Sequence, residues 1–202
     1  MFELVKYGGR RTMAKQAKVL TSSELSKLFK VTELTTYPCR NRLIVAFSFY
    51  AGLRSIEIAN LKVGDVITDE NTVNDIIVLS KEQTKGSKRN VIHVGKKLQK
   101  EILTFVNKHP QIAKNRENRL FKTQRGVFSS QSLQNLFRQL YELANIKNAS
   151  SHSGRRTFIT NLSEKGISTR VIQELARHSS MVTTQRYIDV SNDKLKNAVD
   201  LI

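Results

Sequence analysis

Apolar residues recur at helical spacing in several segments of this chain, and each of these segments predicts a helix. The first predicted helix follows a capping box formed by Thr21 and Glu24. Apolar Leu25, Leu28 and Phe29 come directly afterwards and share one helical face. We therefore expect a helix to begin at this point.

Three further segments extend the helical pattern. Residues 40–53, RNRLIVAFSFYAGL, are apolar on nearly every side, which predicts a helix that crosses the core and ends near Gly52. Residues 55–66, SIEIANLKVGDV, predict a short helix that ends at Gly64. Residues 97–109, KLQKEILTFVNKH, predict another helix.

One segment changes to the spacing of strands. Residues 74–94, NDIIVLSKEQTKGSKRNVIHV, place β-branched runs on both sides of a polar turn with Gly86, which predicts a β-hairpin and the only clear sheet. Residues 119–146 predict a loop and then an amphipathic helix, and the last third predicts short helices separated by Gly166 and by serines 179 and 180. The predicted fold class is mainly α with a small antiparallel hairpin, an α+β arrangement.

Length and composition indicate one globular domain without a membrane span. The chain has 202 residues, of which 39% are apolar, and no apolar run approaches the roughly 18 residues of a spanning helix. The N-terminus has no apolar stretch of the signal-peptide kind, so we expect a cytoplasmic protein. A single cysteine, Cys39, excludes an internal disulfide framework and a cysteine-rich metal site.

The charge balance points to a polyanionic partner. Thirty-four Lys and Arg against 17 Asp and Glu give a formal net charge of +17, and nucleic acid is the expected partner. An anionic membrane surface is less favoured because no segment combines a basic face with a clean apolar face. Residues 1–18 are expected to form a flexible basic arm, with a disordered solubilising tail as the alternative.

Several polar residues are candidates for chemistry, although each has an ordinary explanation when taken alone. An arginine and a glutamate three apart can form a simple helical ion pair, a histidine and an arginine three apart can share a solvated face, and a tyrosine can be a core aromatic. Lys85 can be a solvated turn residue, and His178 can cap the end of a helix. In chain order the candidates are Arg54, Glu57, Lys85, His152, Arg155, His178 and Tyr187.

Four boxes that carry these residues occur in a characteristic order. They are AGLRSIEIANL at 51–61, TKGSKRNVIHV at 84–94, SSHSGRRTFIT at 150–160 and ARHSSMVTTQRYIDV at 176–190. Together they resemble the catalytic domain of the tyrosine site-specific recombinases, the phage integrase family. The resemblance runs from about residue 19 to Tyr187, roughly four-fifths of the chain.

The resemblance implies a role for each candidate. Arg54 of the first box grips the scissile phosphate, with Glu57 as its supporting acid, and the H-x-x-R box supplies His152 and Arg155. Guanidinium groups suit this task, since they are planar, permanently charged clamps for the charge that develops on non-bridging oxygens. A tyrosine hydroxyl has a pKa near ~10, so its attack needs a proton acceptor, and His152 is the natural candidate.

The remaining roles fall on the hairpin and on the last box. Tyr187, nine residues after His178, is the implied nucleophile, and His178 would hydrogen-bond the phosphate. Lys85, in the hairpin turn, suits the general acid that protonates the leaving 5′-oxygen. The acids do not cluster and the histidines lack ligand spacing, so no metal or other cofactor is expected. Further DNA contacts are expected from Arg10, Arg11, Lys15, Lys88, Arg89 and Arg156.

The chain departs from the family pattern in two places. Arg177 stands where the family usually has glycine before the second histidine, and it brings bulk and charge to the edge of the site. Family members commonly carry a separate DNA-clamping domain ahead of the catalytic one, whereas only about 20 residues precede it here. We expect either a catalytic domain taken from a longer protein or a short recombinase resembling the fimbrial-switch invertases.

The expected organisation is a basic arm over 1–18, a catalytic domain over 19–190 and a helical tail over 191–202. The tail has apolar residues at helical spacing, which either pack within the chain or contact a neighbouring protomer; these are Leu195, Ala198, Val199 and Ile202. The expected partners are double-stranded DNA and further copies of the chain, as a tetramer on paired sites.

Two other functions compete with recombination. A type IB topoisomerase shares the phosphotyrosine chemistry but relaxes supercoils as a monomer. A non-catalytic DNA-binding module would bind DNA without cutting it. The full set of six implied catalytic residues argues against the second alternative, and recombined products from two-site DNA would exclude the first.

Overall fold

The structure is a computed structural model that describes residues 16–70, 72–84, 90–124, 126–188, 195, 196, 199 and 200. Several predicted DNA-contacting or catalytic residues lie outside this part of the chain: Arg10, Arg11, Lys15, Lys85, Lys88 and Arg89. Of the predicted tail, Leu195 and Val199 are described and both are exposed.

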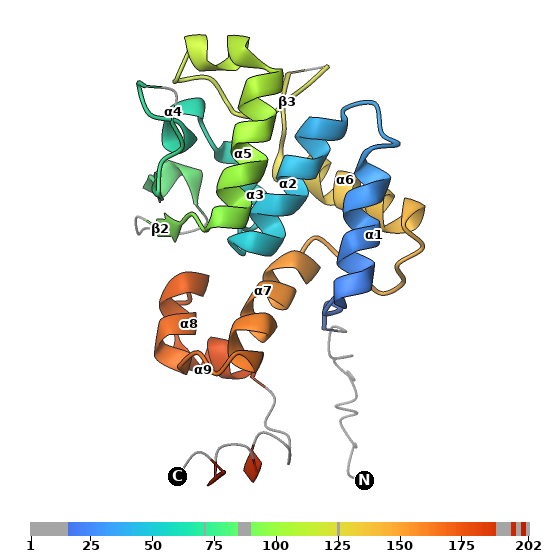
Figure 1. Ribbon diagram of the computed structural model, residues 1–202, viewed down its shortest axis with the longest axis vertical. Helices are drawn as coiled ribbons and strands as arrows, with labels where there is room; N and C mark the ends of the chain where they lie inside the picture. The colour runs from blue at the N-terminus through green and yellow to red at the C-terminus, as the bar shows by residue number, and fades with distance from the viewer. Residues whose placement is uncertain are drawn as a thin grey trace, which may run out of the picture.

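The described residues are mainly helical, as the sequence predicts, and they contain two small antiparallel hairpins (Figure 1). The helices are α1 (Ser22–Thr32), α2 (Pro38–Tyr50), α3 (Ser55–Asn60), α4 (Val63–Val66), α5 (Lys96–Lys108), α6 (Ser130–Leu143), α7 (Ser153–Glu164), α8 (Thr169–Ala176) and α9 (Met181–Gln185). Two 3₁₀ helices are η1 (Lys81–Gln83) and η2 (Pro110–Lys114). The strands are β1 (Ile76–Leu79), β2 (Asn90–His93), β3 (Lys122–Thr123) and β4 (Gly126–Val127).

Helices α1, α2, α5 and α6 surround the main apolar core. The predicted capping box is present, since the Thr21 hydroxyl accepts from the Glu24 N–H (3.2 Å) and the Glu24 carboxylate accepts from the Thr21 N–H (3.1 Å). Helix α2 is buried along most of its length, as its apolar sequence predicts, and ends before Gly52. Phe47 on α2 meets Phe121 edge-on at a ring-centroid distance of 6.0 Å, which ties the later loop to this core.

The predicted hairpin pairs β1 with β2 in register from Ile76↔His93 to Leu79↔Asn90. Its connection begins with η1, where Gln83 is buried and fixed by hydrogen bonds. The Gln83 amide donates to the Asn60 carbonyl (2.9 Å) and to Asp65 Oδ2 (2.6 Å). The base of the hairpin is thereby anchored to α3 and α4.

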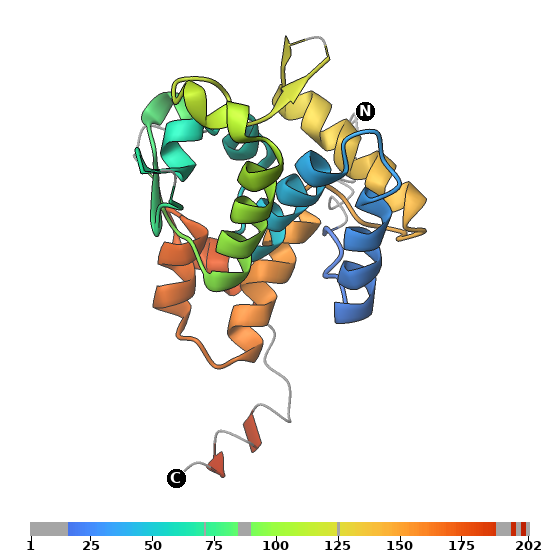
Figure 2. The ribbon, with the colours of Figure 1, turned by 45° about the horizontal axis from the view of Figure 1, so that its top comes forward.

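Two details of the sequence prediction are wrong. The helix that begins at Ser55 ends at Asn60 and not at Gly64, which lies inside the separate turn α4. This break has a local cause, because the Asp65 carboxylate accepts from the Lys62 N–H (2.8 Å) and starts a new helical turn. The first hairpin is also not the only sheet, since the predicted loop contains β3 and β4, which project from the body in Figure 2.

Helices α7, α8 and α9 form the C-terminal region, which gathers at one end of the molecule (Figures 1 and 2). Helix α7 packs against α2 at Gly154, where an added Cβ would lie 2.8 Å from Ser48 Cβ. Only a glycine permits so close an approach. A second apolar cluster lies within this region and contains Ile159, Ile172 and Ala176. Among the described residues, no helix is long and apolar enough to cross a membrane.

Candidate functional site

The first group of the candidate site lies at the start of α3. The Arg54 N–H donates to Glu57 Oε2 (2.8 Å), and Arg54 Nη1 donates to Glu57 Oε1 (2.7 Å). Glu57 is fully buried, whereas the Arg54 side chain is 29% exposed. The helical ion pair considered from the sequence is therefore present, and it holds a partly exposed guanidinium at the helix N-terminus.

Arg155, on the first turn of α7, is buried and not part of a solvated face. Its Nη1 donates to the Gly52 carbonyl (2.7 Å), and its Nη2 donates to the Ala176 carbonyl at the end of α8. Gly52 has φ 61°, and a Cβ there would meet Phe158 at 2.6 Å, so this turn requires glycine. Arg155 thus joins the α2–α3 turn to α8.

Burial and neighbouring charge act together on Arg155. Desolvation, followed by the positive charges of Arg54 and Arg177, lowers the pKa of Arg155 to about 9. The guanidinium still carries its charge at neutral pH. The concentration of positive charge around it suits a phosphodiester.

His178 and Tyr187 lie side by side after α8 and α9. Their rings stack with centroids 5.7 Å apart and planes at 24°. His178 Nδ1 is 2.9 Å from the hydroxyl of Thr184, which is fully buried on α9. Burial, with the charges of three arginines, lowers the pKa of His178 to about 4. The imidazole is therefore neutral at pH 7.

Tyr187 is half-buried and packs against the second apolar cluster. Arg156 lies on its ring, with Cζ 5.7 Å from the centroid, so this predicted DNA-binding arginine contacts the predicted nucleophile. His178 also contacts the ring. Tyr187 is thus both a packed aromatic and a neighbour of the charged groups.

Arg177, expected at the edge of the site, is instead inside it. Its side chain is 4% exposed, and Nη2 donates to Glu57 Oε2 (3.2 Å) and to the Gly52 carbonyl (3.0 Å). The sequence shows that an arginine replaces the family's usual glycine at this position, but it does not show that the side chain points into the site. We refer to Arg54, Glu57, Arg155, Arg177, His178 and Tyr187 as the Glu57 cluster.

Two further predicted catalytic residues, His152 and Lys85, are not members of the Glu57 cluster. His152 is the exposed N-cap residue of α7, three residues before Arg155, and its N–H donates to Ser150 Oγ (3.3 Å). Lys85 lies outside the described residues.

Thr184, which contacts His178, was missed because nothing in a TT pair predicts a buried partner. Among the residues that the structure describes, no group of three or more His, Cys, Asp and Glu could hold a metal ion.

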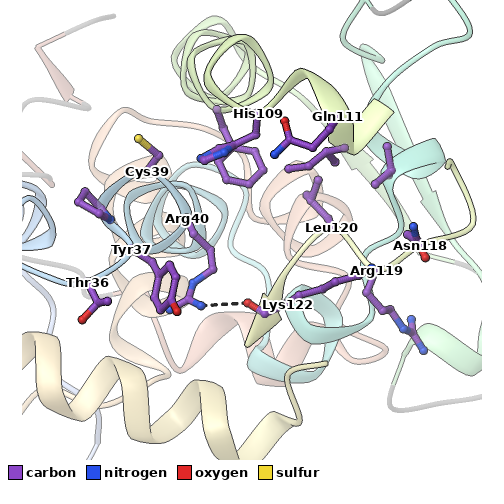
Figure 3. A pocket seen from close by; sticks show the side chains of 14 residues that line it. Thr36, Tyr37, Cys39, Arg40, His109, Gln111, Asn118, Arg119, Leu120 and Lys122 are labelled. Carbon is purple, nitrogen blue, oxygen red and sulfur yellow. Dashed lines mark hydrogen bonds between the residues drawn. The ribbon is translucent and has the colours of Figure 1, made fainter. Parts of the chain in front are cut away.

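A pocket of about 460 Å³ lies elsewhere, between the start of α2 and the end of α5 (Figure 3). Arg40 lies over the Tyr37 ring at 4.1 Å and donates to the Lys122 carbonyl (2.9 Å) at its edge. In the described part of the chain, none of the residues that line it belongs to the Glu57 cluster. The charged site is therefore separate from this pocket.

Sequence comparison finds relatives over most of the chain. Residues 18–194 match the phage integrase family. The chain is 32% identical over 165 residues to the tyrosine recombinase XerD of Corynebacterium glutamicum, covering 80% of this chain and 52% of the relative. It is 32% identical over 186 residues to the tyrosine recombinase XerA of Thermococcus kodakarensis, covering 90% of this chain and 61% of the relative.

Solved structures share the fold. The crystal structure of XerA recombinase superposes with a TM-score of 0.74 and 24% identity, covering 95% of this chain and 65% of that one. The Tn1549 transposon integrase in complex with circular intermediate DNA gives a TM-score of 0.73 at 18% identity, covering 93% and 67%. XerH bound to its difH substrate in a post-cleavage complex gives 0.69 at 20% identity, covering 90% and 51%.

These comparisons confirm the predicted fold class and extend beyond the four boxes. The chain spans 52% and 61% of the length of the two curated relatives described above. The similarity to fimbrial-switch invertases stays a prediction. The match over residues 18–194 places the whole of α1 to α9 within one family, and the chain belongs to the phage integrase family.

Proposed function

We propose that this protein is a site-specific DNA recombinase that cuts and rejoins strands through a 3′-phosphotyrosine. The observation that carries the proposal is the Glu57 cluster, which contains three arginines and in which the neutral His178 stacks on Tyr187. Arg155 is held by two backbone carbonyls, so its guanidinium is fixed in position before a substrate arrives. Family relatives named as tyrosine recombinases support the same activity.

The proposed chemistry transfers a phosphoryl group without net loss of bond energy. The Tyr187 oxygen attacks the scissile phosphorus and gives its proton to a base, for which His152 is the candidate. The bond from phosphorus to the 5′-oxygen breaks, and the departing oxygen takes a proton from Lys85. A second strand's 5′-hydroxyl then reverses these steps and releases Tyr187, so neither ATP nor a metal is required.

His178 would donate a hydrogen bond to the phosphate. A neutral imidazole has one N–H, and a phosphate oxygen can only accept. If the Thr184 hydroxyl donates to Nδ1, the proton remains on Nε2 and points this donor at the substrate. Thr184 would therefore select the imidazole tautomer that the reaction needs.

The decisive experiment is capture of a covalent protein–DNA adduct on a nicked target site, where loss of the short 5′ strand prevents religation. Wild-type protein should accumulate adduct, and Tyr187→Phe should bind the same DNA and form none. Tyr50→Phe is the matched control, since Tyr50 stacks on Phe29 in the main core. Adduct formation by Tyr187→Phe would show that another tyrosine is the nucleophile.

Lys85 can be tested by changing the leaving atom. With a bridging 5′-sulfur the leaving thiolate has a conjugate-acid pKa near ~8.5 and departs with little protonation. Lys85→Ala should therefore cleave normal DNA very slowly and the sulfur substrate almost normally. Arg54→Ala should stay defective on both, because it acts on the non-bridging oxygens. Rescue of both variants or of neither would exclude Lys85 as the acid.

We propose double-stranded DNA as the substrate and a tetramer on paired sites as the working assembly. Support for DNA comes from the net charge of +17 and from integrase-family relatives solved with DNA. Affinity should fall about 10³-fold between 50 and 200 mM salt if six or more phosphates are contacted. A nearly flat salt dependence would contradict this binding mode. We also propose that the protein acts in the cytoplasm, and the proposed DNA substrate supports this.

We keep the division into a basic arm (1–18), a catalytic domain (19–190) and a tail (191–202) as part of the proposal. Replacing Arg10, Arg11 and Lys15 by Ala should weaken binding to all sequences alike, since phosphate contacts carry little sequence information. A loss of affinity confined to one sequence would assign base reading to the arm.

Recovery of recombined products from two-site DNA would separate recombination from simple relaxation of supercoils.

A further inference from the structure

Arg177 occupies a backbone conformation and an environment that both disfavour arginine. It is the C-cap of α8 with φ 55° and ψ 45°, the left-handed region that glycine adopts most easily. Residues with a Cβ are strained in this conformation. Its guanidinium is also almost fully buried, and burial lowers its pKa while Glu57 opposes the shift. Two unfavourable features at one residue call for a compensating role.

The contacts of Arg177 reach across the chain to the α2–α3 turn. Its Nη1 donates to the carbonyls of Leu175 (2.9 Å) and Ala51 (3.3 Å). Its Nη2 donates to the carbonyl of Gly52 and to Glu57 Oε2. The guanidinium thus connects the end of α8 to residues that precede and follow Arg54.

Two of these acceptors are shared with the arginines of the proposed reaction. The Gly52 carbonyl accepts from Arg155 Nη1 (2.7 Å) as well as from Arg177 Nη2 (3.0 Å). Glu57 uses Oε1 for the Arg54 side chain and Oε2 for the Arg54 N–H and Arg177. A displacement of Arg177 therefore changes the surroundings of both Arg54 and Arg155.

Electrostatic interactions also link Glu57 to the guanidinium groups of Arg177 and Arg54. Burial of Glu57 raises its pKa, but the charge of Arg177 and then that of Arg54 outweigh burial, and its pKa lies below the ordinary value. Glu57 therefore stays ionised between two guanidinium groups. Without Arg177, the full charge of Glu57 would act on Arg54 and compete with a phosphate for that guanidinium.

The position of Arg177 in the chain adds a second connection. The next residue is His178, whose ring stacks on Tyr187. The anchored backbone at 177 is therefore the start of the segment that carries both side chains. A fixed Arg177 sets the distance between this segment and the Arg54 turn.

We propose that Arg177 is a positioning residue that acts through Glu57 and Gly52: it divides Glu57 between two arginines and holds the His178–Tyr187 segment against the Arg54 turn. The proposal rests on the recombinase function proposed above. Arg177 is not expected to touch the substrate, because its side chain is buried.

The first test is Arg177→Gly, which removes the guanidinium and places in the left-handed conformation the residue that tolerates it best. The variant should fold. At saturating nicked DNA, single-turnover adduct formation should fall about 10- to 100-fold, as expected when reacting groups are misplaced by about 1 Å. DNA affinity should change less than twofold. Asn145→Gly is the matched control, since Asn145 also has positive φ (52°) and lies outside the Glu57 cluster.

Conservative replacement separates positioning from packing. Arg177→Lys keeps the charge near Glu57 but cannot reach several carbonyls at once, so it should restore part of the rate lost in Arg177→Gly. If Arg177→Lys is as slow as Arg177→Gly, charge sharing through Glu57 is excluded.

A double-mutant cycle then tests the route through Glu57. In a Glu57→Gln background, Arg177→Gly should slow adduct formation by clearly less than it does in the wild type. Equal factors in both backgrounds would overturn the proposal, as would a wild-type rate in Arg177→Gly. Absence of adduct with the wild-type protein on a verified site would overturn the recombinase function and this inference with it, whereas normal adduct in both wild type and Arg177→Gly overturns the inference alone.

Discussion

The main body and the C-terminal region of this protein are held together by different forces. The body, α1 to α6, packs large buried aromatic residues such as Phe47, Phe121 and Phe137 into one apolar core. The C-terminal region, α7 to α9, has a small apolar cluster around Ile159 and Ile172. Buried arginines supply polar connections from this region to the body. One region is stabilised mainly by apolar packing and the other largely by charged hydrogen bonds.

The difference shows that stability and chemistry depend on the same side chains in the C-terminal region. Arg155 and Arg177 hold α8 against the α2–α3 turn, and they also belong to the cluster that we assign to phosphate chemistry. In the body, by contrast, the large core aromatic residues Phe47, Phe121 and Phe137 are not members of the Glu57 cluster. Substitutions in the two regions should therefore be distinguishable by experiment.

The largest expected effect is on the body. Phe47→Ala removes a fully buried ring that contacts Phe121, and it should lower the free energy of unfolding by about 3–5 kcal/mol. Urea denaturation followed by far-UV circular dichroism would measure this. A loss below about 1 kcal/mol would mean that the body does not depend on this packing.

Arg155→Ala should affect stability less than Phe47→Ala but in a more localised way. It leaves the Ala176 carbonyl without this buried donor, which costs about 1–3 kcal/mol, whereas the Gly52 carbonyl still accepts from Arg177 Nη2. Hydrogen exchange should accelerate in α7 and α8 and remain slow in α6. The control is Arg54→Ala, whose more exposed side chain should leave exchange in α8 closer to wild type. Uniform acceleration across all helices would remove the distinction between the regions.

Ile172→Val tests the small apolar cluster by removing one methylene group. Ile172 is fully buried on α8, and such a truncation typically costs about 0.5–1.5 kcal/mol. The loss should appear in exchange rates of α8 and not in those of α2. If α2 responds equally, the two regions unfold as one unit.

The last expected effect is a pH dependence from His178. The unfolded residue takes up a proton near the ordinary pKa of 6.5, whereas burial, followed by the charges of three arginines, lowers the folded pKa to about 4. Between these values the unfolded chain binds more protons, so the free energy of unfolding should decrease as pH falls from about 6.5 to 4. His178→Gln should flatten this part of the profile relative to wild type. Parallel profiles would contradict the lowered pKa.

Much of the fold could be predicted because its signals are local. The capping box of α1, the apolar sequence of α2 and the hairpin turn each lie within a few residues of the structure they determine. Gly64 was misread because glycine often ends helices, whereas the actual break comes from Asp65 and Lys62. The β3–β4 pair was missed because two-residue strands leave no periodic pattern.

The site was predictable in its members but not in its arrangement. The family resemblance carried by the four boxes implies Arg54, Arg155, His178 and Tyr187 as site residues, and the structure includes all four among its described residues. Arg177 could be noticed as an exception, but three of its acceptors lie more than 100 residues earlier in the chain, so only the folded structure shows that it points inwards. Thr184 was hidden for the same reason, since its role depends on which side of α9 faces His178.

The close contact between Gly154 and Ser48 also restricts how the sequence can change over time. An added Cβ at 154 would overlap the Ser48 side chain, and a larger residue at 48 would overlap the α7 backbone from the other side. Neither position can accept a bulkier residue unless the other becomes smaller, and at 154 nothing smaller exists. Drift at the two positions is therefore coupled, and viable descendants of this chain should keep glycine at 154 and a small residue at 48.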